Sequence, residues 1–370
     1  MVKGIYIHIP FCNIKCPYCD FVSFINEDEQ LYERYVNTIL KELSFYQNEN
    51  FNIRTIYFGG GTPSVLKPEL IGKIISYIRN QFDTIKNPEI TMEINPKTYK
   101  ENDFYKVANY GVNRISIGSQ SFLRKNLQSL GRDHQPIDVL KTVEYALKSG
   151  INNISLDMIY GISGQTLDDL QKDLEIYTSL PIKHISAYML TAYEDTPLGK
   201  MVEKQEYQMP DEDITTLMFE KISDYFESKG FFRYELSNWA KLGFESRHNL
   251  LYWEDKQFLG VGLSAWSYIG NKRFGNVKNI NEYLKRVEND KKPVEYSEIL
   301  DEREKKREKI FLGLRLSKGI DIRDFNSVDI FEELSEQKLG VIDNNRFKLT
   351  SRGLMVINEV ARKLIQELNL

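Results

Sequence analysis

The sequence predicts an α/β fold that is built on parallel strands and followed by a smaller C-terminal domain. Two observations lead to this prediction. Short β-rich segments alternate with amphipathic helical segments up to Leu190, which is the pattern of parallel strands joined by crossover helices. After Pro210 this alternation stops and longer helices follow. With 370 residues, of which 41% are hydrophobic, the chain is long enough for two domains.

Six β-rich segments are predicted to be strands: Gly4–Ile9, Thr55–Phe58, Glu89–Ile94, Asn113–Ile117, Asn153–Ile159 and His184–Leu190. Helices are predicted between them where apolar residues recur about every 3.6 positions. These helices cover Glu29–Gln47, Pro68–Phe82, Glu101–Tyr110, Pro136–Ser149 and Leu167–Thr178. Six such units are too few for a closed eight-stranded barrel, so periodicity alone leaves a doubly wound sheet or an open barrel.

The second part of the chain begins with a long amphipathic helix, Asp211–Lys229, and continues with a glycine- and aromatic-rich stretch that ends at Phe274. The segment Ser297–Arg315 is densely charged with alternating signs, which is typical of a solvated helix face. A short strand at Phe347–Leu349 and a final helix, Ser351–Leu368, complete the chain. We therefore expect a small helical domain with a wing.

The charge balance argues against nucleic acid as a partner, and the apolar pattern predicts where the protein is located. Lys and Arg total 49 against 53 Asp and Glu, and the net charge of −4 gives no overall attraction to nucleic acid. The first residues lack the pattern of a secretory signal, and no apolar run approaches the roughly 20 residues that span a bilayer. We expect a cytoplasmic protein that does not bind nucleic acid.

The three cysteines of the chain, Cys12, Cys16 and Cys19, lie within eight residues and indicate a metal site. A cube-shaped [4Fe–4S] cluster normally takes four cysteines, so three thiolates would leave one iron open to an exchangeable ligand. The alternative is a zinc site completed by His8 or by a distant histidine. Structural zinc usually takes two separated ligand pairs, and the chain has no second pair.

The spacing Cys-x3-Cys-x2-Cys directly after an N-terminal strand resembles the cluster loop of the radical S-adenosylmethionine (SAM) superfamily. The flanking residues, Ile7–Phe11 and Pro17–Phe21, resemble the branch that contains oxygen-independent coproporphyrinogen III oxidase and the HemW group of haem chaperones. The resemblance is strong over residues 3–275. It implies an open (β/α)6 partial TIM barrel of radical SAM type with a smaller C-terminal α+β domain that is winged-helix-like. It also implies a [4Fe–4S] cluster and SAM, which the reduced cluster cleaves to methionine and a 5′-deoxyadenosyl radical.

The run Gly59-Gly60-Gly61-Thr62-Pro63 follows the second predicted strand, where successive glycines allow the backbone to approach a ligand closely. It matches neither a Walker P-loop nor a dinucleotide-binding fingerprint. By itself the run is equally well explained as a sharp turn. Because it comes one unit after the cysteine loop, it resembles the glycine motif that binds the SAM amino group in radical SAM proteins.

Polar residues at the carboxyl ends of the predicted strands are further candidates, because α/β barrels gather their sites there. Glu93, Gln120 and Asp157 hold such positions, with solvated strand ends as the alternative interpretation. Asp157 lies in an apolar run and therefore needs a partner. The resemblance implies SAM-binding positions at Tyr6, Tyr18, Gly60, Gly61, Thr62, Glu93, Gln120, Arg132, Asp157 and Thr191. Among these, Arg132 offers a bidentate fork to the methionine carboxylate.

Two departures separate the chain from the oxidase of this branch. The oxidase carries a further cysteine two residues after the third, where this chain has Phe21, and it has an N-terminal extension ahead of the cluster loop. Both departures favour a haem chaperone, with a radical SAM oxidoreductase of the oxidase type as the alternative. Whether the chain is an enzyme stays open, and no catalytic residue is predicted.

The run Arg247-His248-Asn249-Leu250-Leu251-Tyr252-Trp253 resembles the His-Asn-x-x-Tyr-Trp signature of the HemW group. A neutral imidazole is a normal axial ligand of haem iron, and aromatic rings offer an apolar surface to a porphyrin. We expect haem contacts at His248, Asn249, Tyr252 and Trp253, with His248 as the candidate iron ligand. The alternative is a packed, hydrogen-bonded histidine.

The expected function is therefore to bind haem and to transfer it to an acceptor, which we expect to be a membrane respiratory protein that brings the chaperone to the membrane periphery. Three segments are predicted: a radical SAM core at 1–235, an extension with the haem signature at 236–295 and a C-terminal helical domain at 296–370. Composition does not decide whether the chain forms a homodimer, for which the cluster edge and the C-terminal domain are the candidate surfaces.

Overall fold

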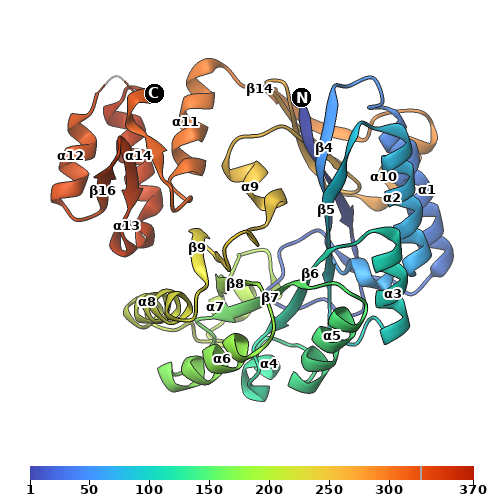
Figure 1. Ribbon diagram of the computed structural model, residues 1–370, viewed down its shortest axis with the longest axis horizontal. Helices are drawn as coiled ribbons and strands as arrows, with labels where there is room; N and C mark the ends of the chain where they lie inside the picture. Colours follow the sequence, from blue (N-terminus) through green and yellow to red (C-terminus); the bar gives the residue numbers. More distant parts are fainter. Residues whose placement is uncertain (326) are drawn as a thin grey trace.

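Six parallel strands form the centre of the fold in the order that the sequence predicts. In the computed structural model, which describes residues 1–325 and 327–370, they are β1 (Val2–Ile9), β4 (Phe51–Gly60), β5 (Thr84–Ile94), β6 (Arg114–Gln120), β7 (Asn153–Tyr160) and β8 (His184–Met189). Each strand pairs in parallel with the next one. Helices connect them and cover the outer face of the sheet (Figure 1). The connecting helices are α1 (Glu29–Ser44), α2 (Pro68–Gln81), α3 (Glu101–Tyr110), α4 (Arg124–Ser129), α5 (Pro136–Lys148) and α6 (Leu167–Ser179), while α7 (Pro197–Glu203) and α8 (Glu212–Ser228) follow β8.

The sheet is open and mixed, so the predicted open partial barrel is confirmed and the doubly wound alternative is not. At one edge β11 (Phe258–Val261) adds to β1 in parallel, and β12 (Trp266–Ile269), β13 (Lys272–Asn276) and β14 (Val294–Ile299) continue antiparallel. At the other edge β10 (Asn238–Ala240) and β9 (Phe232–Glu235) follow β8, also antiparallel. Strands from the predicted extension thus join both edges of one sheet, while the boundaries at 235 and 295 stay a prediction.

Alternation along the strands separates an apolar outer face from a polar inner face. On β4, Ile56 and Phe58 are fully buried in the core that the strands share with the surrounding helices. Between them, Tyr57 is only partly buried, and its hydroxyl donates a hydrogen bond to Glu93 of β5. The interior of the barrel is therefore polar, and its side chains are available for a site.

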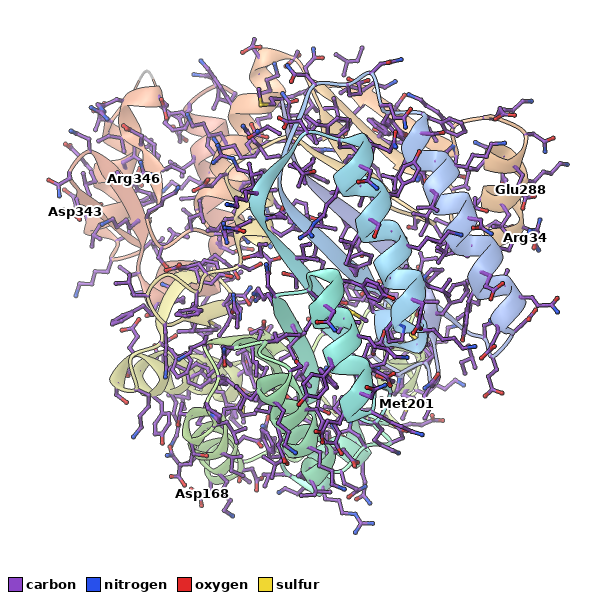
Figure 2. The ribbon with its side chains drawn as sticks, turned by 45° about the vertical axis from the view of Figure 1, so that its right-hand side comes forward. Arg34, Asp168, Met201, Glu288, Asp343 and Arg346 are labelled. Atoms are coloured by element: carbon purple, nitrogen blue, oxygen red, sulfur yellow. The ribbon has the colours of Figure 1, made fainter. Side chains whose placement is uncertain are left out.

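The predicted extension at 236–295 contacts the barrel through α10 (Ile280–Glu288), which packs beside α1. On the surface, the Arg34 guanidinium makes a bidentate ion pair with Glu288, at 2.6 and 2.8 Å (Figure 2). In the core, the Glu42 carboxylate accepts hydrogen bonds from Tyr283 Oη and Asn276 Nδ2, both at 2.6 Å. Burial raises the pKa of Glu42 to about 7, against the effect of these donors.

Two predicted helix boundaries were wrong. Residues 297–299 belong to the edge strand β14, because they pair with β13, and α11 (Glu302–Gly313) begins only where the Asp301 side chain caps it. The predicted final helix is two helices, α13 (Ser351–Met355) and α14 (Ile357–Glu367), because Val356 has a non-helical φ of −117° and ψ of 31°.

The C-terminal unit is helical with a small sheet, as predicted. Its three-stranded sheet has the order β15-β17-β16, from β15 (Ile320–Asp321), β17 (Arg346–Leu349) and β16 (Gly340–Asp343). It packs with α12 (Asp329–Glu336) and α14 around Phe331 and Phe347. In the described residues, none of the helices has the length and apolar character that crossing a membrane requires.

Candidate functional site

A cavity of ≈ 390 Å³ opens at the carboxyl ends of the parallel strands. Nine of the ten predicted SAM positions line it: Tyr18, Gly60, Gly61, Thr62, Glu93, Gln120, Arg132, Asp157 and Thr191. Tyr6 is not among the lining residues. Its hydroxyl shares a hydrogen bond of 3.1 Å with His8 Nδ1, and its ring stacks on Tyr57.

The three cysteines line the same cavity as free thiols. Cys12 ends β2 (Phe11–Cys12), which pairs with β3 (Phe24–Ile25), so the loop that carries all three sulfur atoms closes on itself. Thr62 Oγ1 donates to Cys12 Sγ at 3.6 Å, and Arg132 Nη1 donates to Cys16 Sγ at 3.4 Å. Burial raises the pKa of the Cys12 and Cys19 thiols, so that binding iron would release their protons.

His8 does not complete a zinc site in this arrangement. Its Nε2 shares a hydrogen bond of 2.8 Å with the Val22 carbonyl and its Nδ1 is engaged by Tyr6, while burial lowers its pKa to about 4. Across the described residues, no three His, Cys, Asp or Glu side chains are arranged to hold a single metal ion. A cluster takes one thiolate per iron, so the three sulfur atoms do not need to converge on one point.

The glycine run allows the cysteine loop to pack closely against it. A Cβ on Gly61 would lie 2.6 Å from the Phe11 carbonyl oxygen and 3.0 Å from Cys12 Sγ, so a side chain there would displace the loop. Gly60 has a φ of +109°, which disfavours other residues, and its absent side chain leaves room for the His8 ring. The backbone N–H of Thr62 then donates to the Phe11 carbonyl at 2.7 Å. The glycines are therefore required because the cysteine loop approaches them closely, and not only because the chain turns here.

Two of the carboxylates that line the cavity, Glu93 and Asp157, come from the parallel strands. Glu93 accepts hydrogen bonds from Tyr57 Oη at 2.8 Å and from the Gly60 N–H at 3.3 Å. Burial raises its pKa to about 7, and the nearby Asp157 acts in the same direction. Burial also raises the pKa of Asp157. Because Asp157 lies in an apolar run it needs a polar partner, and Ser116 Oγ donates a hydrogen bond to it at 3.0 Å.

Arg132 lies between the cysteine loop and the strand ends. Its Nη2 donates to the Gly118 carbonyl at 2.8 Å and to Asn95 Oδ1 at 2.9 Å, whereas its Nε is buried without a hydrogen-bond partner among the described residues. An unpartnered buried donor beside a cavity suits a carboxylate ligand.

These observations fit the two cofactors that the cysteine spacing implies. Three thiols can hold a [4Fe–4S] cluster, while the free Arg132 Nε and the Glu93 carboxylate suit the carboxylate and amino groups of SAM. When bound, the cluster and SAM supply one-electron cleavage of a carbon–sulfur bond. The protein's own residues orient the ligand and limit the access of water.

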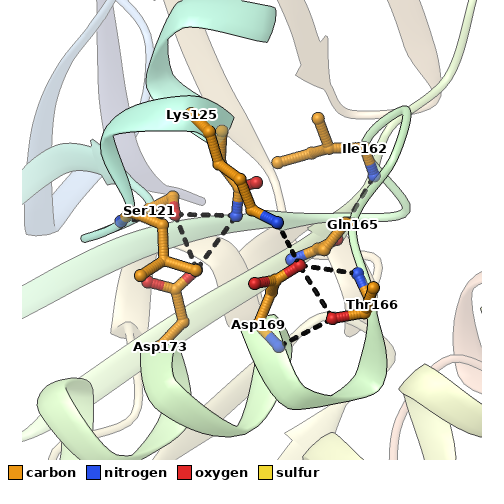
Figure 3. A network of polar contacts seen from close by, with 9 residues as sticks. Ser121, Lys125, Ile162, Gln165, Thr166, Asp169 and Asp173 are labelled. Atoms are coloured by element: carbon orange, nitrogen blue, oxygen red, sulfur yellow. Dashed lines mark hydrogen bonds and ion pairs between the residues drawn. The ribbon is translucent and has the colours of Figure 1, made fainter.

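A polar network fixes the loops after β6 and β7 (Figure 3). Asp173 of α6 accepts from Ser121 Oγ and from the Phe122 N–H, both at 2.6 Å, directly after Gln120. Gln165 Oε1 accepts from the Gly161 N–H at 2.9 Å in the neighbouring loop. This network positions Gln120, and no motif in the sequence pointed to it.

Sequence reasoning also missed part of the cavity wall: Asn95, Ser116, Gly118, Tyr188, Met189 and Tyr193. A signal was available for some of them. Inward residues alternate along a strand, so the prediction of Gln120 on β6 also points to Gly118 and Ser116 in steps of two.

The predicted haem residues do not line this cavity. They lie on α9 (Arg247–Trp253), which packs on the inner side of β1 and β4 (Figure 1). His248 is 1% exposed, with Nδ1 2.7 Å from Thr55 Oγ1 and Nε2 2.8 Å from Tyr252 Oη. Asn249 and Trp253 are partly exposed. Glu89, which the sequence did not single out, accepts from the backbone N–H groups of Arg247 and His248, each at 3.1 Å.

The open barrel with a three-cysteine loop and a glycine motif defines the class of radical SAM proteins. In agreement, the family model of the radical SAM superfamily matches residues 6–176, and that of the HemN C-terminal domain matches residues 300–356. The fold is also similar to coproporphyrinogen III oxidase (HemN) from Escherichia coli, with a TM-score of 0.84 and 18% identity over 98% of this chain and 89% of that one.

Relatives of similar length identify the family within the radical SAM class. The heme chaperone HemW of Lactococcus lactis is 32% identical, and the alignment covers 98% of both chains. HemW of Bacillus subtilis is also 32% identical, over 99% of this chain and all of that one. The chain therefore belongs to the HemW family.

Proposed function

We propose that the protein is a haem chaperone, which binds haem and transfers it to an acceptor protein. Its full-length relatives carry the name heme chaperone, which supports this function. The observation that carries the proposal is Phe21, which stands where the resemblance to the oxidase would place a fourth thiol. Its side chain lines the cavity and is 59% exposed.

Exposed apolar side chains in the cavity of Phe21, which the predicted haem contacts on α9 do not line, support haem as the cargo. Tyr188, Met189 and Tyr193 line the same cavity and are each between two-fifths and one-half exposed. Such side chains offer a flat apolar surface of the kind that a porphyrin face buries.

The proposal assigns haem contacts to α9, with His248 as iron ligand. Ligation requires the imidazole to leave Thr55 and Tyr252, which costs about 1 kcal/mol for each hydrogen bond and is offset by the bond to iron. We expect the wild-type protein to retain haem through gel filtration and His248→Ala to lose it, as measured by the haem absorption band. Retention of haem by the variant would show that His248 is not the iron ligand.

Transfer is tested with haem-loaded protein and an apo-haemoprotein. Transfer of the haem absorption band from the protein to the apo-haemoprotein supports a chaperone. Haem that stays on the protein argues against this function. We further propose a membrane respiratory acceptor, and the test distinguishes it from a soluble one by comparing membranes that contain apo-cytochrome with soluble apo-globin.

We also propose that Glu93 binds the SAM amino group and that the remaining cavity positions surround SAM. Because burial raises the pKa of Glu93 to about 7, the carboxylate takes up a proton as the pH falls below that value and no longer attracts a cation. SAM affinity should therefore rise about tenfold from about pH 6 to about pH 8. Anaerobic equilibrium dialysis measures this, and Glu93→Gln should remove most of the difference; an unchanged pH profile in the variant would contradict the role of Glu93.

A further inference from the structure

The interior of the barrel connects the helix with the predicted haem residues to the cavity with the predicted SAM residues. The His248 ring stacks on the Tyr57 ring, with centroids 5.0 Å apart and an interplanar angle of 28°. The Tyr57 hydroxyl donates to Glu93 Oε1 at 2.8 Å. One aromatic side chain thus separates His248 from a carboxylate of the cavity.

The His248 ring is held firmly in this position. Thr55 and Tyr252 occupy its two nitrogens, and the Glu89 carboxylate accepts from its backbone N–H. Gly4 makes room for it, because a Cβ there would lie 2.5 Å from both Leu251 Cδ1 and Thr55 Oγ1 and 3.2 Å from His248 Nδ1. An imidazole that is held at both ring nitrogens can hold the ring on which it stacks.

Tyr57 in turn determines where the Glu93 carboxylate points. The other donor to Glu93 is the Gly60 N–H, at a longer distance of 3.3 Å. Tyr6 stacks on the Tyr57 ring as well, but with the centroids 6.1 Å apart. His248 is therefore the nearer of these two rings to Tyr57.

We propose that His248 is a positioning residue for the SAM pocket, which acts through the Tyr57 ring on the Glu93 carboxylate. This proposal rests on the proposed SAM site. It gives α9 a role in SAM binding although none of its residues lines the cavity.

The test measures SAM affinity of the anaerobically reconstituted full chain, with iron content and the electron paramagnetic resonance spectrum of the reduced cluster as further readouts. His248→Ala should weaken SAM binding about fivefold and reduce the spectral change on SAM addition, with iron content unchanged. Tyr57→Phe, which removes the hydroxyl, should weaken binding at least as much. Because both act on one path, the double variant should be no weaker than Tyr57→Phe alone.

Three further variants distinguish a positioning role of His248 from a general loosening of the structure around α9. His248→Phe keeps a ring over Tyr57 and should recover most of the affinity, whereas His248→Gln keeps polar atoms but no ring and should not. Leu251→Ala opens a space in the same helix and keeps the His248 and Tyr57 side chains, and it should bind SAM within about twofold of wild type. Equal losses in Leu251→Ala and His248→Ala, or fold-changes that multiply in the double variant, would overturn the proposal. A wild-type protein that binds no SAM would instead refute the SAM site itself and this inference with it.

Discussion

Replacing Cys16 with serine is expected to abolish the iron–sulfur cluster. The three thiols are the only cysteines of the chain, and all of them line one cavity. A hydroxyl is a poor substitute for a thiolate, and two remaining thiolates are too few to hold a cube-shaped cluster. Anaerobically reconstituted wild type should contain about four irons per chain with broad visible absorption, and Cys16→Ser close to none.

Asn13→Ser provides the matched control, because Asn13 is an exposed residue of the same loop. It should load iron like the wild type. Full iron content in Cys16→Ser, or stoichiometric zinc in place of iron in the wild type, would contradict a three-cysteine cluster.

Removing the Arg132 guanidinium is expected to have the second-largest effect. Arg132→Met loses the buried Nε donor, which has no partner among the described residues, and leaves the Gly118 carbonyl and Asn95 without their donor. A hydrogen bond to a charged group contributes about 1.5–3 kcal/mol, so SAM affinity should fall about 10- to 100-fold. Equilibrium dialysis at matched iron content measures this.

Arg132→Lys should lie between wild type and Arg132→Met, because it keeps the charge but not the fork. Lys97→Met is the control for charge alone, since Lys97 makes an exposed ion pair with Asp133 at 3.3 Å and lines a neighbouring pocket together with Arg132. Equal losses in Lys97→Met and Arg132→Met would mean that overall charge, rather than the Arg132 donors, attracts the ligand.

Part of the cavity wall could be predicted, because parallel strands bring their carboxyl ends together. Once the strands before Gly60, Glu93 and Gln120 were assigned, the edge that they share followed from the fold class. The cysteine loop followed from spacing alone. Local patterns were sufficient for these features, because each depends on one strand and the residues directly after it.

The sheet edges and α9 could not be predicted in this way. The strands β9–β13 are three to five residues long and lie in a glycine- and aromatic-rich stretch without clear periodicity. The burial of His248 depends on Thr55, Glu89 and the absent side chain of Gly4, which are far from it in sequence. Contacts of this kind come from tertiary packing, and no local signal carries them.

We propose that this radical SAM site serves haem handling and not porphyrinogen oxidation. The most direct test of this proposal incubates the reconstituted protein anaerobically with SAM, a reductant and coproporphyrinogen III, and follows the products by chromatography. We predict no protoporphyrinogen, while the same preparation retains added haem. Stoichiometric formation of protoporphyrinogen would contradict the claim and assign the chain to the oxidase reaction.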